Sequence, residues 1–200
     1  MAKGSGGGGG VVKDRNIYGT IGNDVLGTRD KGTTFGFAGN DTIIGGAGFD
    51  VVHGGDGNDT IRVGAADDKV WGGLGSDFLD GGTGSDWVNY GNELGQGGVG
   101  ATSGVTVNLD ITTAQNTGGG GIDTIVGFEN IGGSDFADLF TGLTNQTSTI
   151  LGLGGNDSII GGNVADSLYG MDGDDTVDGG AGNDNIEGNN GRSEEHTSEL

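Results

Sequence analysis

Aspartate recurs every nine residues over long stretches of the chain, each time in a short glycine-rich segment. The first run contains Asp41, Asp50, Asp59, Asp68, Asp77 and Asp86, and a second run contains Asp157, Asp166, Asp175 and Asp184. Glycine-rich loops can turn their carbonyl oxygens toward one point, and the aspartate adds a carboxylate. Such hard oxygen ligands in a flexible loop suit Ca²⁺, which takes about 6–8 oxygens, better than a metal that prefers nitrogen or sulfur.

A period of nine residues fits no helix, but it fits a six-residue turn followed by a three-residue strand. Two places after each aspartate of the first run stands a β-favouring apolar residue: Ile43, Val52, Ile61, Val70, Leu79 and Val88. We expect these six side chains to form one continuous core. The glycines at the first, second and fourth positions of a unit supply backbone conformations with positive φ that other residues resist.

Further copies of the unit are shorter or degenerate. Asp24 occupies the ligand position of an early copy (Gly19–Leu26), and Asp123, followed by Ile125, occupies that of a later one. The unit that carries Asp68 lacks glycine at two turn positions, and the residues 163–165 interrupt the unit that carries Asp166. We expect these two to be the weaker sites.

The pattern GGxGxDxUx resembles the RTX, or haemolysin-type, calcium-binding repeat. The resemblance implies an all-β fold, a right-handed parallel β-roll (solenoid) in which two nonapeptides make one coil. Loops eighteen residues apart would then stack, with a Ca²⁺ between each stacked pair, so that the chain holds several ions. One stack would hold Asp24, Asp41, Asp59 and Asp77, the other Asp50, Asp68 and Asp86, and the second run would pair Asp157 with Asp175 and Asp166 with Asp184.

The resemblance also implies that loop carbonyl oxygens complete each calcium shell. The residues that would supply them are Gly36, Ala38, Gly45, Ala47, Gly54, Asp56, Gly72, Leu74, Gly81, Thr83, Gly152, Gly154, Gly170, Asp172, Gly179 and Ala181.

These patterns divide the chain into five segments. We expect a disordered glycine-rich N-terminus (1–18), a first roll block (19–89), a β spacer with degenerate repeats (90–150), a second, truncated block (151–191) and a non-repetitive tail (192–200). Within the spacer, Val105–Leu109 alternates as a strand with one buried face. The tail matches, residue for residue, the translation of a common short-read sequencing adapter, so we interpret it as foreign to the natural chain and assign no function to it.

Charge and composition exclude several classes of function. With 29 acidic against 8 basic residues and a formal charge of −21, the chain lacks the basic face that nucleic-acid binding needs. No apolar run is long enough to span a membrane, and Met1–Gly10 lacks the apolar core of a cleaved signal peptide. Outside the tail the sole histidine is His53, at an outward repeat position, where a surface role is favoured over catalysis. We expect no enzymatic activity.

Taken with the resemblance, these features predict an extracellular calcium-binding module that folds on binding Ca²⁺. The family's route would be type I secretion without a cleaved N-terminal signal. Two kinds of parent protein fit: a surface or adhesive repeat protein, with a cell-surface or matrix partner of unknown identity, or a secreted protease, lipase or polysaccharide-modifying enzyme that uses the repeats for export and folding. The spacer between the blocks favours the first.

Overall fold

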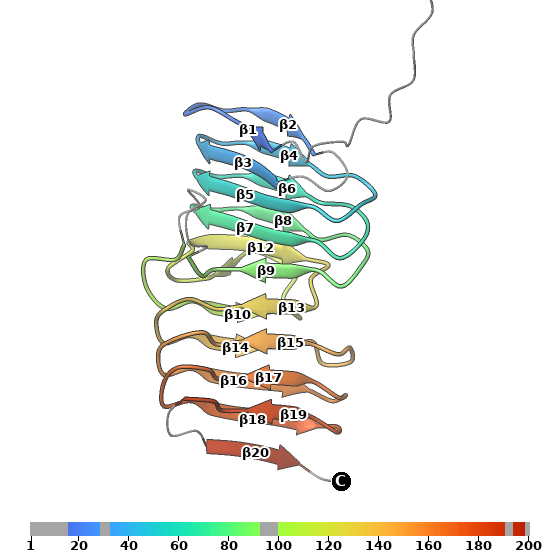
Figure 1. Cartoon of the computed structure of the whole chain (residues 1–200), viewed down its shortest axis with the longest axis vertical. Coiled ribbons are helices and arrows are strands. Elements are labelled where there is room, and N and C mark those ends of the chain that lie inside the picture. The colour runs from blue at the N-terminus through green and yellow to red at the C-terminus, as the bar shows by residue number, and fades with distance from the viewer. Residues whose placement is uncertain (1–15, 29–32, 93–99, 191–193, 199–200) are drawn as a thin grey trace, which may run out of the picture.

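The computed structural model describes residues 16–28, 33–92 and 100–190, and the backbone of 194–198. These residues form a roll of parallel strands, with none of them in a helix, so the predicted all-β parallel β-roll is confirmed (Figure 1). Within this described part, no helix could cross a membrane. The predicted disorder of Gly4–Gly10 and most of the segment 92–103 fall outside the described residues.

One face of the roll is a nine-stranded sheet in which every pair of neighbours is parallel. Its strands, in spatial order, are β1 (Ile17–Tyr18), β3 (Thr33–Ala38), β5 (Val51–Asp56), β7 (Lys69–Leu74), β9 (Trp87–Asn89), β13 (Asn130–Gly132), β15 (Thr149–Leu151), β17 (Ser167–Tyr169) and β19 (Asn185–Glu187). β1 lies within the segment that the sequence assigned to the N-terminus, so the ordered roll begins earlier than residue 19.

The opposite face consists of two sheets. The first has six strands in the order β11 (Gln115–Asn116), β12 (Ile122–Val126), β8 (Phe78–Asp80), β6 (Thr60–Arg62), β4 (Thr42–Ile44) and β2 (Val25–Gly27). The second has five strands in the order β10 (Thr106–Asn108), β14 (Leu139–Thr141), β16 (Ser158–Gly162), β18 (Thr176–Ala181) and β20 (Glu194–Ser198). The backbone of β20 lies beside β18, and the foreign origin of 192–200 stays a prediction.

Between the two blocks the spatial order of the strands departs from the order of the chain. After β9 the chain places β10 against β14, then returns through β11, which pairs antiparallel with β12, so that β12 can extend the first sheet beyond β8. β13 then joins β9 to β15. We term the described residues 90–92 and 100–150 the seam, because here the two sheets of one face meet while the nine-stranded face continues unbroken.

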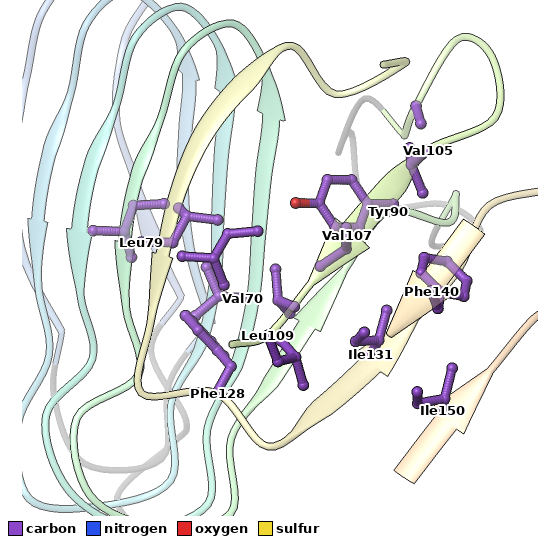
Figure 2. Close-up of a cluster of buried hydrophobic side chains, with 14 of the residues drawn as sticks. Val70, Leu79, Tyr90, Val105, Val107, Leu109, Phe128, Ile131, Phe140 and Ile150 are labelled. Carbon is purple, nitrogen blue, oxygen red and sulfur yellow. The ribbon is translucent and has the colours of Figure 1, made fainter. Parts of the chain in front are cut away.

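The core is continuous through both blocks and the seam. Each of the six predicted core residues of the first run, from Ile43 to Val88, is fully buried, which confirms the nine-residue register. In the seam the core contains larger and more numerous side chains, among them Tyr90, Phe128 and Phe140 (Figure 2). Val105, Val107 and Leu109 are buried as the alternation in that strand predicted.

The outward side chains of the first coils form an aromatic stack. His53 lies between Phe35 and Trp71, with ring centroids 4.8 and 4.6 Å away. Its side chain is only 2% exposed, and burial lowers the pKa of His53 to about 4. The prediction of a surface role was therefore wrong: the ninth position points away from the core, but neighbouring rings on parallel strands cover it.

Candidate metal centres

Aspartates of successive coils are joined by a repeated hydrogen bond. The backbone N–H of Asp41 donates to Oδ1 of Asp59 over 2.8 Å, and that of Asp59 donates to Oδ1 of Asp77 over 2.8 Å. On the other edge, the Asp50 N–H donates to Asp68 in the same way over 2.7 Å. The loops eighteen residues apart therefore stack in the two rows that the resemblance implied.

The second carboxylate oxygen of most of these aspartates is buried without a hydrogen-bond donor. Among the residues that the structure describes, this holds for Oδ2 of Asp41, Asp59, Asp68, Asp77, Asp86, Asp157, Asp175 and Asp184. A buried carboxylate oxygen without a partner is costly, and native structures leave few such groups. The repetition of the same orphan atom in successive coils indicates that these oxygens have a common ligand.

A backbone carbonyl of the next coil points to the same place as the orphan oxygen. A Cβ built on Gly36 would collide with both Oδ2 of Asp41 and the carbonyl oxygen of Gly54. We term such a pair of oxygens, an aspartate Oδ2 and a carbonyl of the next coil, a cradle. Corresponding cradles surround Gly54 (Asp59 Oδ2 and Gly72 O), Gly81 (Asp86 Oδ2 and Gly127 O) and Gly152 (Asp157 Oδ2 and Gly170 O). The first glycine of the unit thus leaves open a pocket of oxygens that any other residue would fill.

Burial makes these carboxylates hard to ionise without a counter-charge. Desolvation raises the pKa of Asp59 and Asp68 to about 6, of Asp86 and Asp157 to about 7, and of Asp77 to about 8. Hydrogen bonds from the neighbouring coil oppose this rise, and the charges of neighbouring acids add to it. Because the folded pKa values lie above those of the unfolded chain, these groups favour the metal-free roll at low pH and disfavour it as the pH rises through 6–8.

The atoms that could bind a metal here are all oxygens, and the carboxylates among them lie apart from one another. Among the described residues, no three Asp, Glu, His or Cys side chains converge on one point, so a metal here would depend on backbone carbonyls as well as carboxylates. First-position carbonyls enter the cradles at Gly36, Gly54, Gly72, Gly170 and Gly179, but those of Gly45 and Gly81 are not placed beside an aspartate oxygen, so their role as ligands stays a prediction. The third-position carbonyls of Asp56, Leu74 and Asp172 each accept one backbone hydrogen bond from the preceding coil, which leaves one lone pair free. Their predicted role as ligands stays a prediction.

Several predicted ligand carboxylates already accept hydrogen bonds from the chain through the oxygen that is an orphan elsewhere. Oδ2 of Asp24 accepts from Thr20, Oδ2 of Asp166 from the Gly162 N–H, and Oδ2 of Asp123 from Thr117 and Tyr90. Asp50 accepts from Thr28 and from the N–H of Gly46.

Two further acidic residues take part in the repeated hydrogen bonds between coils, and the sequence did not predict them. Asp138 accepts the N–H of Val105 over 2.8 Å, and its own N–H donates to Asp157 over 2.8 Å. Its position five residues after Gly133 was the available signal, obscured by Phe136 at a glycine position. Glu129 accepts the N–H of Asp86 over 2.9 Å, and no periodic signal marks it.

The loop of Asp68 has Val63 in place of the first glycine and backbone strain at its fourth position. Ala66 stands at a glycine position and has a φ of +84°, which side chains disfavour by about 1–2 kcal/mol. We expect Ala66→Gly to stabilise the calcium-loaded roll by about 1 kcal/mol, because relief of the strain exceeds the added entropy of the unfolded chain. Urea denaturation would measure the free energy of unfolding.

The matched control is Ala65→Gly, since Ala65 has no positive φ and pairs with Thr83 in an isolated bridge. That change should destabilise the roll by up to about 1 kcal/mol. Equal effects of the two substitutions would contradict the strain at Ala66.

Comparison with known families agrees with this geometry. A family model described as the RTX calcium-binding nonapeptide repeat matches the chain four times, at residues 35–70, 53–88, 145–163 and 160–193. Together the matches cover just over half of the chain, and they include both runs of orphan carboxylates. No curated protein matches the chain.

Proposed function

Since the chain belongs to the RTX calcium-binding nonapeptide repeat family, whose repeats bind Ca²⁺, we propose that calcium gates the folding of this roll. The observation that carries the proposal is the row of buried carboxylate oxygens without donors. Calcium bound there would supply positive charge at the positions where the fold leaves negative charge uncompensated.

The residues that would hold the ions are those of the cradles. In the first block, Oδ2 of Asp41 with the Gly54 carbonyl, and Oδ2 of Asp59 with the Gly72 carbonyl, would each contribute to one ion between stacked loops. In the second block, Asp157 and the Gly170 carbonyl have the same arrangement. When bound, calcium supplies charge compensation and cross-links neighbouring coils.

Without calcium the balance of folding is unfavourable in the repeat blocks. Most nine-residue units bury one large apolar side chain, such as Ile61 or Leu79, while they order several glycines. Ionised aspartates in successive coils also repel one another. The free energy of calcium binding therefore becomes the free energy of folding.

Gated folding suits a protein that is exported as an unfolded chain. Extracellular calcium modules have dissociation constants of about 10⁻⁴–10⁻³ M, so the chain would stay unfolded in a calcium-poor cytosol and fold outside the cell. We therefore infer type I secretion and an extracellular location. The parent would be a surface or adhesive repeat protein, because repeats, seam and second block form one continuous roll that presents an extended surface (Figure 1).

A circular-dichroism titration of the purified chain tests the gating. We expect little β-structure in chelator and a cooperative gain of β-signal as Ca²⁺ rises into the millimolar range. Mg²⁺ should substitute poorly, because it demands a tighter octahedron and loses its water reluctantly. A full β spectrum in chelator, identical to that in millimolar calcium, would refute the proposal.

A further inference from the structure

In the seam both carboxylate oxygens of Asp123 and of Asp138 accept hydrogen bonds from the chain, whereas Oδ2 of most aspartates in the repeat blocks has no donor. Asp123 is 1% exposed, and its Oδ1 accepts the N–H of Asp77 over 3.0 Å. Its Oδ2 accepts the hydroxyl of Thr117 over 2.8 Å and that of Tyr90 over 3.3 Å. Both hydroxyl-bearing residues are themselves buried, so the donors have no competing water.

The next carboxylate of the seam is satisfied in a similar way. Oδ2 of Asp138 accepts the N–H of Ser134 over 2.7 Å, and its Oδ1 accepts the Ser134 hydroxyl over 2.7 Å and the Val105 N–H over 2.8 Å. Ser134 stands at the second position of its unit, where the regular loops of the first block have Gly55 and Gly73. A hydroxyl thus occupies the place of a glycine at a unit whose aspartate has no orphan oxygen.

At a third position of the seam, Ser148 stands where the regular stacks have an aspartate. The N–H of Ser148 donates to Oδ1 of Asp166 over 2.7 Å, which is the bond that an aspartate N–H makes in the regular stacks. Its hydroxyl accepts the N–H of Leu143 over 2.9 Å. Three positions of the seam therefore carry hydrogen bonds where most aspartates of the repeat blocks have an orphan oxygen.

The seam also contains a cluster of large buried apolar side chains. Figure 2 shows Tyr90, Val107, Leu109, Ile131 and Phe140 gathered around the point where the strand order changes. Residues from β10, β13 and β14, distant in sequence, contribute to this one cluster. Burial of such side chains stabilises by about 1.5–3 kcal/mol each, which favours folding of the seam without a metal.

We propose that hydrogen-bond donors of the chain take the place of calcium in the seam, namely the hydroxyls of Thr117 and Tyr90 at Asp123 and the N–H and hydroxyl of Ser134 at Asp138, so that the seam folds without calcium and the blocks then assemble on it as calcium binds. The proposal rests on calcium gating of the blocks, and it assigns Asp123 a different role from the calcium ligand that the sequence predicted. Asp24, whose Oδ2 accepts from Thr20, has the same kind of partner at the N-terminal end.

Hydrogen exchange of the full-length chain, read by mass spectrometry in chelator and at rising calcium, tests this assignment. In chelator the amides of Val105, Leu109 and Leu139, which are hydrogen-bonded within the seam, should be protected. Those of the first block, such as Thr60 and Phe78, should exchange as in an unfolded chain until calcium is added. Protection of the seam that rises only with the blocks, at the same calcium concentration, would overturn the inference and leave calcium gating intact. Blocks that do not respond to calcium would overturn the gating.

Variants of the hydroxyl partners sharpen the test. The double change Tyr90→Phe and Thr117→Val leaves Oδ2 of Asp123 buried without a side-chain donor, so protection of the seam in chelator should be lost and should return when calcium is added. The control is Asp123→Asn, because a neutral amide can still bond to both hydroxyls; it should keep the protection in chelator and the calcium midpoint of the blocks.

A carboxylate that binds calcium should behave in the opposite way. Asp59→Asn retains an oxygen for the Asp41 N–H but removes the charge, and we expect a rise of about tenfold or more in the calcium midpoint of the first block. If Asp123→Asn raises that midpoint as much as Asp59→Asn does, Asp123 is a calcium ligand and the inference is wrong. If the double variant keeps full protection in chelator, the hydroxyls are not what stabilises the seam.

Discussion

Replacing Gly54 with alanine is expected to raise the calcium concentration for half-folding about tenfold or more. The added Cβ would collide with the carboxylate of Asp59 and the carbonyl of Gly72, the two oxygens of one cradle. Either the methyl group displaces the ion or the coils separate, and both remove favourable binding free energy of roughly 1.4 kcal/mol or more. Calcium titration followed by circular dichroism would measure the shift.

The control for this substitution is Gly22→Ala. Gly22 lies in the first coil, has no positive φ, and a Cβ built there would meet only the Thr20 hydroxyl, 3.9 Å away. We expect little change in the calcium midpoint. If Gly54→Ala titrates like Gly22→Ala, the space beside the first glycine does not hold the ion, and the cradle is an accident of close backbone packing.

The second large effect is expected for Asp59→Ala, which should raise the calcium midpoint more than Asp24→Ala. The loop of Asp59 takes part in two cradles, because its carboxylate faces the Gly72 carbonyl and its Gly54 carbonyl faces Asp41. Asp24 is at the outer end of the same stack, and its loop contributes to one cradle only. In a repeat protein, stability is approximately a sum of nearest-neighbour terms, so an interior loop counts twice.

Tryptophan fluorescence during a calcium titration can follow all variants, since Trp71 is buried in the first block. We expect a shift of about tenfold or more for Asp59→Ala and of about threefold or less for Asp24→Ala. Asp68→Ala should fall between them, because the strain at Ala66 weakens the site of Asp68 already. Equal damage from Asp24→Ala and Asp59→Ala would show that neighbouring loops do not share ions.

The periodic signal in the sequence is sufficient to predict the core but not every residue of the sites. The nine-residue spacing correctly identified the buried residues from Ile43 to Val88, and the resemblance to the RTX repeat correctly implied which loops stack. It failed for His53, which is covered by rings of the neighbouring coils. It also missed Asp138, whose unit has Phe136 at a glycine position, and Glu129, which no periodic signal marks.

The sequence by itself determined the repeat, the core register and the chemistry of the loops, because each depends on residues within one unit or one coil. Only the tertiary structure decided how the blocks join. There Asp77 pairs with Asp123, 46 residues away, and Asp86 with Glu129, 43 residues away, in place of the eighteen-residue step. The reason is that the chain crosses back between β10 and β12, and the order of strands after a crossing depends on long-range packing that no local period encodes. The same crossing brings the hydroxyls of Tyr90 and Thr117 to Asp123. In our proposal these donors replace the metal at Asp123, whereas the orphan Oδ2 of a repeat aspartate such as Asp59 requires one.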